Sequence, residues 1–533
     1  MNHHSTKRTL LKNIQRVQLL VSDHREQQYV KIESHIKRLK HEVEMHDIWG
    51  KLTKDEHVKI NKDIFSIFED LITACRRKRN VLHFDEIYEP DRTTQDILRN
   101  LGCLDICIKV LTLHNTIDPN ESLNLVNKNT KSLVATCNIL LYWFVLDNKA
   151  NQQIAFANLQ FFIKTIDAKI NSHKVINAIY SNNEYLMKIT PKKVISEFAS
   201  FICTIGKFPQ YLSLLGAVVS AGDKNIIENQ YEVIRLISSP NNQRKVVQFF
   251  TPVTHPDYAK KVKLMSPYIN KKDVLLDDLP SDLAYHMELM NVLSRCTIGR
   301  ANMTTIEAKV QSLFHFVDVV QAILDPNSIL LAKIRLGLFL YNAVLEVEMR
   351  LPSLKDAACI WELLVSTQDI FTFSKDELRQ VEKNGLSSPT THRQKLEYMI
   401  VCAKIVYGYF EFYFDRTIYR ADMSSSAIGV ARMQLKESQC NEIIRNIFSG
   451  IKGVYDMQSP ILDSDHQDIL YKALLALNVS ASEPIVAYVE KLHQDKSAIL
   501  GTATHPITHS LTYSLTHSLT HSLTHSLISI SEE

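Results

Sequence analysis

The feature that most constrains this chain is a series of amphipathic segments joined by very short links. Apolar residues recur every three or four positions from Ser132 to Asp147 and again from Asn151 to Ile166, a spacing typical of helices. Only the tripeptide "NKA" lies between these two segments. Because so short a link holds consecutive helices side by side, we expect them to form an antiparallel pair.

The same pattern predicts helices along most of the chain. Proline suits the first turn of a helix, and three of the predicted segments begin with it. The chain has only 13 Gly and 15 Pro among 533 residues, so hairpins and tight β-connections are expected to be few. The fold class is therefore predicted to be all-α, an armadillo- or HEAT-like α-solenoid of antiparallel helix pairs. The further predicted helices are Asn182–Met187, Pro191–Ile205, Pro209–Ala221 and Pro280–Cys296.

Two polar stretches, Ser238–Lys245 and Glu382–Arg393, are expected to be loops, and the second is expected to precede a C-terminal section. No strict sequence repeat accompanies the helices, so the solenoid prediction depends on length and topology. The predicted organisation is an N-terminal helical segment at 1–80, a helical solenoid at 81–370, a C-terminal helical section at 371–500 and a low-complexity tail at 501–533.

The tail repeats the tetrapeptide Thr-His-Ser-Leu, which a tandem tetranucleotide read in frame would encode. We interpret it as a translated microsatellite that is disordered and that can mark a chain cut short of its natural end. Its spaced histidines are not assigned to a metal, because nothing fixes their geometry. These histidines are His505, His509, His517, His521 and His525.

Composition argues against several classes of protein. The net charge of +3 provides no global field for nucleic acid or an anionic membrane. The most apolar run, Leu133–Leu146, is shorter than the roughly 20 residues of a membrane span and suits a buried core helix. Nine scattered cysteines without a CxxC pair and a polar start, Met1–Arg16, favour reduced thiols in the cytosol.

The stretch "LAYHMELMNVLSRC", Leu283–Cys296, raises the question of a site, because it contains His286, Glu288 and Cys296. A zinc deaminase would need a PCxxC motif downstream, which this sequence lacks. We therefore expect a packed helix, with His286 and Cys296 at the edge of its core and Glu288 facing water. The predicted core stripe consists of Leu283, Met287, Met290 and Leu293, and Tyr285, Glu288 and Asn291 lie away from it.

Two further motifs approach metal sites and fail on spacing. "HEVEMH" separates His41 and His46 by five positions, which places them about 140° apart around a helix and so prevents a shared zinc ion. "DSDHQD" begins like a calcium loop at Asp463, but Asp468 stands where glycine is needed and Leu474 where glutamate is needed. Both stretches are predicted to be ordinary helix surface or loop.

Cys103 and Cys107 lie one helical turn apart and could share a soft metal, although buried small apolar residues are favoured. The basic run Arg76–Arg79 could bind a phosphoinositide or an acidic partner, although a solvated charge run is favoured. The sequence shows no phosphate loop and no nucleophile motif. We accordingly assign no catalytic, cofactor-binding or metal residues and expect no enzyme.

One segment has a specific resemblance. "DLAYHMELMNVLSRCTIGRANMTTIEAKVQSLFHFVDVVQAIL" is similar to the central RIH (ryanodine–inositol trisphosphate receptor homology) region of inositol 1,4,5-trisphosphate receptors and ryanodine receptors. The likeness extends over roughly 86 to 365, including "DRTTQDILRNLGCLDICIKVL" and "NQQIAFANLQFFI". The residues that fit the family pattern best are Tyr285, His286, Leu289, Leu293, Cys296, Gly299, Asn302, Thr305, Glu307, Lys309, Ser312, Leu313, Asp318, Val319 and Val320.

This resemblance implies a regulatory, non-catalytic cytosolic solenoid of an intracellular calcium-release channel, at the endoplasmic reticulum, as a fragment or a diverged relative. The family's β-trefoil ligand-binding entry and its pore find no match here, and no trisphosphate-binding residue is carried over. The implied partners are other channel segments or regulatory proteins, with a homotetramer only in a full channel. The alternative is a free α-solenoid scaffold that binds a protein on its concave surface.

Overall fold

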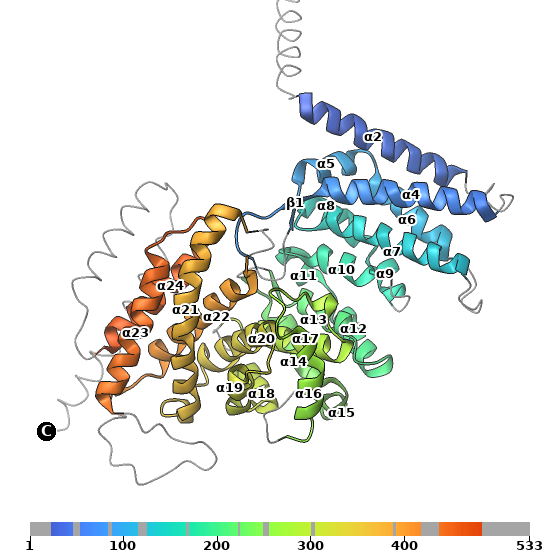
Figure 1. Ribbon diagram of the computed structural model, residues 1–533. Helices are drawn as coiled ribbons and strands as arrows, with labels where there is room; N and C mark the ends of the chain where they lie inside the picture. Colours follow the sequence, from blue (N-terminus) through green and yellow to red (C-terminus); the bar gives the residue numbers. More distant parts are fainter. Residues whose placement is uncertain are drawn as a thin grey trace, which may run out of the picture.

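A computed structural model shows a curved array of helices that begins at α2 and ends at α24 (Figure 1). The structure describes residues 23–45, 54–83, 88–115, 125–166, 170–221, 224–248, 255–299, 304–386, 391–416 and 436–481. Helices dominate these residues, and the strands form two short antiparallel pairs, which confirms the all-α solenoid. The predicted tail and its five histidines lie outside the described residues, as does His46.

After the two 22-residue helices α2 and α4, the N-terminal half consists of units that begin with the short helices α5, α8, α11 and α14. The first three of these arise because an Asp or Asn at the N-cap starts them and the chain then turns into longer, more apolar helices. The helices of this half are α2 (Asp23–Glu44), α4 (Lys54–Cys75), α5 (Arg92–Asn100), α6 (Cys103–Asn115), α7 (Leu125–Val145), α8 (Lys149–Phe156), α9 (Leu159–Lys164), α10 (Ser172–Tyr180), α11 (Glu184–Ile189), α12 (Lys192–Thr204), α13 (Pro209–Ala217), α14 (Ile227–Ile237) and α15 (Pro240–Val246).

The C-terminal half contains the longest described helix, α21 (Ala358–Asn384), with 27 residues. Helices of this half pack directly on one another, α22 on α24, α21 on α23 and α20 on α22. Its elements are α16 (Tyr258–Met265), η2 (Ser266–Tyr268), η3 (Leu276–Asp278), α17 (Ser281–Cys296), α18 (Thr304–Leu313), α19 (Phe316–Leu324), α20 (Leu330–Leu340), η4 (Tyr341–Leu345), η5 (Pro352–Leu354), α21 (Ala358–Asn384), α22 (Arg393–Phe412), α23 (Glu437–Tyr455) and α24 (Ser464–Ser480).

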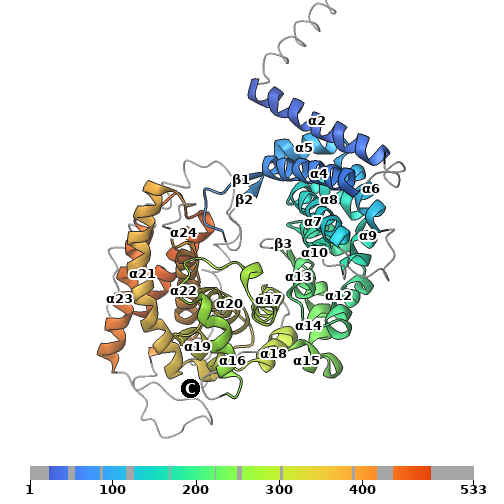
Figure 2. The same cartoon turned by 45° about the vertical axis from the view of Figure 1, so that its right-hand side comes forward.

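The two halves are joined on the side away from α17 by the segment that follows strand β1. Strand β1 (Arg76–Lys78) pairs with β2 (Tyr88–Pro90), and the chain reaches the C-terminal half between these two strands (Figure 2). There the amide of Leu82 donates to the carbonyl of Ile461 at 2.9 Å, and Arg393 Nη1 donates to the carbonyl of His83 at 3.1 Å. A second pair, β3 (Ser220–Ala221) and β4 (Lys224–Asn225), leads from α13 into α14.

Several predicted boundaries differ from the structure, and the helix expected from Ser132 already begins at Leu125. The helix expected over Asn151–Ile166 is two helices, α8 and α9, because the chain bends at Ala157–Asn158 without any break in the apolar spacing. The loop expected over Ser238–Lys245 contains α15, which starts at Pro240, a residue suited to a first turn. The helix from Pro209 ends at Ala217 and gives way to β3.

The apolar core runs through both halves, and α17 lies between them, packed on α13 and α20. The predicted core stripe of α17 is confirmed, since Leu283, Met287, Met290 and Leu293 are all fully buried. Among the residues that the structure describes, no helix combines the length and apolar character needed to cross a membrane. The Leu133–Leu146 run instead forms most of the buried part of α7.

Candidate functional site: an inner cavity with a basic wall

A cavity of about 910 Å³ lies on the inner side of the solenoid. One side is built by the ends of α7, α10 and α13, which follow one another down the molecule, and the other by η3, α20 and α22, with α17 between them (Figure 2). Its size falls within the range of small-molecule pockets, about 300–1,000 Å³. The cavity is therefore the candidate site of this chain.

Helix α17 faces the cavity with a polar stripe. Ser281, Ala284, Glu288, Asn291 and Arg295 all line it, at successive spacings of three and four residues. Such residues lie on one face of a helix, and here that face is opposite the apolar stripe. The sequence correctly placed Glu288 and Asn291 away from the apolar stripe, but Tyr285, expected with them, is fully buried in the core. The polar face also meets an inner cavity rather than the outer surface.

The expectation that Glu288 faces water is therefore wrong. Glu288 is only 6% exposed, and Asn291 Nδ2 donates a hydrogen bond to its Oε1 at 3.2 Å. Arg335 from α20 also reaches this point, where its Nη1 donates to Asn291 Oδ1 at 3.1 Å. Glu288, Asn291 and Arg335 thus form a connected polar group in the cavity wall.

Arg295 completes this wall from the last turn of α17. Its Nε donates to Ser220 Oγ at 3.1 Å and its Nη2 to the carbonyl of Ser220 at 3.0 Å, which joins α17 to β3. Burial lowers the pKa of Arg295, and the nearby charge of Arg335 lowers it further, whereas Glu288 opposes both. Gly216 of α13 allows α17 to approach closely beside this group, because an added Cβ would come within 3.2 Å of Val292 Cγ2.

Two more cations line the cavity, each beside a carboxylate. Lys174 Nζ lies 2.7 Å from Asp277 Oδ2, and Arg393 Nη1 lies 3.0 Å from Glu397 Oε1. His173 is next to Lys174, and burial lowers the pKa of its imidazole to about 4. His173 is therefore neutral at neutral pH, and the fixed positive charges of the wall come from lysine and arginine.

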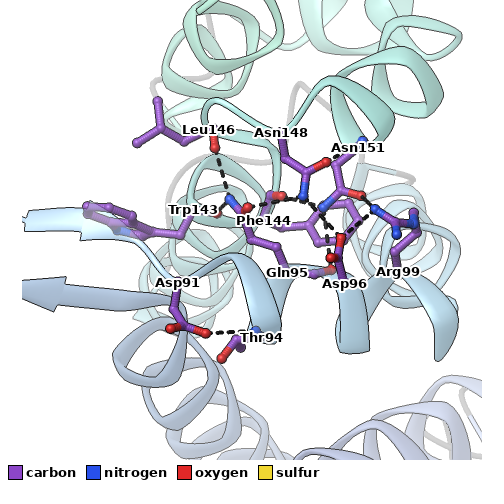
Figure 3. Close-up of polar contacts among 10 residues, drawn as sticks. All are labelled: Asp91, Thr94, Gln95, Asp96, Arg99, Trp143, Phe144, Leu146, Asn148 and Asn151. Atoms are coloured by element: carbon purple, nitrogen blue, oxygen red, sulfur yellow. Dashed lines mark hydrogen bonds and ion pairs between the residues drawn. The ribbon is translucent and has the colours of Figure 1, made fainter. Parts of the chain in front are cut away.

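Buried amides hold in place the helix ends that form the cavity wall (Figure 3). Gln95 Nε2 donates to the carbonyls of Trp143 at 2.7 Å and Leu146 at 2.9 Å, which are among the unpaired carbonyls at the end of α7. Asn148 Nδ2 donates to Gln95 Oε1 at 3.1 Å, and Asn151 Nδ2 donates to the carbonyl of Phe144 at 2.7 Å. Trp143 and Leu146 line the cavity.

Side chains next to these amides fix the start of α5. Asp91 accepts the amide of Thr94 at 2.8 Å as an N-cap (Figure 3). Arg99 lies 2.7 Å from Asp96 Oδ1 and donates to Asn151 Oδ1 at 3.0 Å. Side chains of α5 and α8 are thereby linked, so the first helices of successive units stack on one another.

The arrangement recurs one unit further along. Gln152 Nε2 donates to the carbonyls of Ala178 at 2.9 Å and Ser181 at 2.6 Å, at the end of α10. Asn183, the N-cap of α11, donates to Gln152 Oε1 at 2.8 Å. Ala178 and Ser181 also line the cavity, so Gln152 supports the wall as Gln95 does.

A third set of such amides lies at α14. Gln230 Nε2 donates to the carbonyls of Arg295 at 3.0 Å and Ile298 at 3.1 Å, at the end of α17. Asn229 Nδ2 donates to the carbonyls of Met187 and Val218. We call Gln95, Asn148, Asn151, Gln152, Asn183, Asn229 and Gln230 the amide ladder.

Sequence reasoning missed the ladder, although a signal is present. Three glutamines stand four residues after the N-cap of a short helix: Gln95 after Asp91, Gln152 after Asn148 and Gln230 after Ile226. Unit lengths differ, so no fixed period reveals the pattern. A search for Asp or Asn followed four positions later by Gln, at the start of a short helix, would have found the first two.

The residues singled out in the sequence do not assemble. His286 Nδ1 contacts the carbonyl of Gln248 at 3.0 Å, and both His286 and Cys296 are buried in the core rather than at its edge. Cys103 and Cys107 are fully buried, as favoured, with Sγ atoms 3.8 Å apart. Burial and this thiol contact raise the pKa of Cys103 well above its ordinary value.

The basic run Arg76–Arg79 forms the exposed strand β1 and the residue after it. Arg77 pairs with Glu89 at 2.6 Å and Arg76 lies over the ring of Tyr88. Asp463 caps α24 by accepting the amide of His466 at 2.9 Å. Across the described part of the chain, no three His, Cys, Asp or Glu side chains gather as metal ligands.

Comparison with known proteins identifies one domain. Residues 65–244 match the family model of the RIH domain, a range that contains the whole amide ladder. The inositol 1,4,5-trisphosphate receptor itr-1 of Caenorhabditis elegans is 25% identical over 244 residues, which is 44% of this chain and 8% of that protein. This chain therefore spans a small fraction of the length of that relative. The predicted resemblance is confirmed at the level of the RIH domain.

Among solved structures, a chain from work on the phosphorylation switch that controls the interaction between cadherin and beta-catenin aligns with 83% of this chain and 91% of its own length. The sequences are 11% identical and the TM-score is 0.26, and this likeness is too weak to support a conclusion about fold or function. The stretch Tyr285–Val320 lies beyond the RIH match, and the likeness predicted there stays a prediction.

Proposed function

We propose that this chain, a relative of inositol 1,4,5-trisphosphate receptors through its RIH domain, is a regulatory, non-catalytic section of an intracellular calcium-release channel. It acts on the cytosolic side of the endoplasmic reticulum membrane. Its partners are other segments of such a channel or proteins that regulate it. A homotetramer forms only where the chain is part of a full channel.

The observation that carries this proposal is the RIH match, combined with where the matched residues lie. They build the helix ends on one side of the inner cavity and the ladder behind them. A wall held by buried hydrogen bonds transmits a displacement as a rigid body, since satisfied polar networks rigidify a core. Such a wall suits a regulatory section that passes a conformational change between its two halves.

Calcium release from permeabilised cells tests this role. Cells that lack the gene are compared with cells that re-express the full chain, at a fixed concentration of trisphosphate. We expect the rate of release to differ and re-expression to restore it. A Met290→Asp chain, which cannot pack α17, serves as the matched unfolded control. Equal release in all three lines would contradict the proposal.

A free scaffold is the second candidate, and exposed apolar residues favour it. The stacked first helices present a row of exposed apolar side chains, in which the surface of Tyr185 is 64% exposed. Tyr185→Asp leaves the core untouched and would disrupt a protein interface at this row. Loss of a bound partner with unchanged calcium release would favour the scaffold over the channel section. The row consists of Ile154, Tyr185, Ile189, Ile227 and Tyr231.

A further inference from the structure

The wall of the inner cavity contains more fixed positive than negative charge. The described residues that line it include four permanent cations, Lys174, Arg295, Arg335 and Arg393, and two carboxylates, Asp277 and Glu288. Arg335 and Arg393 are only 5% and 4% exposed, and the carboxylate of Glu397 lies beside Arg393, 3.0 Å from its Nη1.

The excess is concentrated at one point. Arg295 and Arg335 come from different helices and converge on the carboxylate of Glu288. Because both are positively charged, each makes it less favourable for the other to carry its charge. Asn291 holds Arg335, and Ser220 holds Arg295 from the other side, so both guanidinium groups are fixed in position. Two guanidinium groups held in this way present planar donors that match the oxygens of a phosphate or a carboxylate.

The same cavity has an apolar part. Helix α7 contributes Ile139, Tyr142, Trp143 and Leu146 to its lining. Pockets for organic ligands combine an apolar surface with a few fixed polar groups that orient the ligand. An inorganic ion would use only the arginine side, whereas an organic anion would use both.

We propose that the cavity is a binding site for a small organic anion, whose phosphoryl or carboxylate group is bound by Arg295 and Arg335 and whose apolar body contacts the α7 wall. Binding places one molecule against helices of both halves. The ligand thus stabilises one relative position of the N-terminal units and the C-terminal section. This site does not depend on the proposed channel role.

Phenyl phosphate, benzoate and inorganic phosphate serve as probes on the full chain at matched ionic strength. The fluorescence of Trp143, assigned with a Trp143→Phe variant, reports occupancy together with isothermal titration. We expect saturable binding of at least one aromatic anion, at least about tenfold tighter than inorganic phosphate, the factor that about 1.4 kcal/mol of apolar contact supplies. The comparison of phenyl phosphate with benzoate shows which acid group the arginines prefer.

Opposite charge changes sharpen the test. Arg295→Gln should weaken binding about tenfold or more, since a hydrogen bond to a charged group contributes about 1.5–3 kcal/mol. Glu288→Gln removes the competing carboxylate and should tighten it. Arg379→Gln removes an arginine that pairs with Asp376 on the exposed side of α21, away from the cavity, and should leave binding unchanged. Melting curves establish that each variant is folded.

Three outcomes would overturn the proposal. One is the absence of saturable binding by any of the three probes. Another is equal weakening by Arg295→Gln and Arg379→Gln, which would indicate general charge attraction. A third is weaker binding in a folded Glu288→Gln variant, because the carboxylate would then assist the ligand rather than compete with it.

Discussion

The two halves of this molecule hold their helices together by different means. In the N-terminal units, buried amides carried by short helices bind the ends of neighbouring helices, as Gln95 and Gln152 do at α7 and α10. In the C-terminal section, long helices pack through apolar surfaces and small residues. Gly337 of α20 lies against Val401 of α22, where an added Cβ would come within 2.4 Å of Val401 Cγ1.

Helix ends need partners in both halves, because every helix leaves about four carbonyls without an intrahelical partner at its end, whatever its length. The short helices α5, α8 and α14, with 9, 8 and 11 residues, supply amides to the ends of α7, α10 and α17. In the C-terminal section, by contrast, α20 and α22 pack closely along their sides. Helix α17 lies at the junction and uses both means, a packed stripe and a cap from Gln230.

The largest effect is expected at this junction. Met290→Asp places a carboxylate among the fully buried side chains of α17 and removes apolar burial. We expect the free energy of unfolding to fall by about 4 kcal/mol or more. Chemical denaturation measures it, with Met290→Leu as a control that should cost less than about 1.5 kcal/mol. A stable Met290→Asp protein would remove α17 from the core.

Loss of a ladder amide should be the next most severe change. Gln152→Leu keeps the approximate volume and leaves two carbonyls at the end of α10 without their donor, at a cost of about 3 kcal/mol. Hydrogen exchange should show loss of protection in α8 to α11 and unchanged protection in α22 and α24. The exposed neighbour provides the control, since Gln153→Leu should stay within about 0.5 kcal/mol. Uniform loss across both halves would show that the halves are not held separately.

A substitution at the contact between α20 and α22 tests the C-terminal half in the same way. Gly337→Ala forces apart α20 and α22 and should cost about 2 kcal/mol, with the loss of protection confined to this half. Gly453→Ala is the matched control, because its Cβ would meet only the flexible side chain of Lys375. That variant should be neutral or stabilised by up to about 1 kcal/mol, from helix propensity. Equal destabilisation by both would contradict the close approach at Gly337.

The sequence predicted the helical class and the apolar stripe of α17 from side-chain periodicity and the scarcity of Gly and Pro, and it predicted the solenoid from length and topology. It did not predict the bend at Asn158, since apolar spacing continues across it. It placed Glu288 in water, because one helix does not reveal whether a polar face meets solvent or a cavity built by residues far away, such as Arg335. The ladder pairs, such as Gln95 with Trp143, are tertiary contacts that become visible only when the units are stacked.

The smallest effect concerns acid stability at the junction. Burial holds the pKa of His286 at about 4, below its ordinary 6.5, so the unfolded chain binds more protons than the folded chain as the pH falls from 6.5 towards 4. Its contribution is complete above pH 6.5 and declines below that, by about 1 kcal/mol between pH 6.5 and 5.5. Burial lowers the pKa of His173 in the same way, so the wild-type curve contains both losses. Denaturation at several pH values gives the slope of the free energy of unfolding against pH for wild type and for His286→Gln. The difference between these two slopes is the contribution of His286. Equal slopes would mean that His286 is already charged in the folded protein and that the junction admits water.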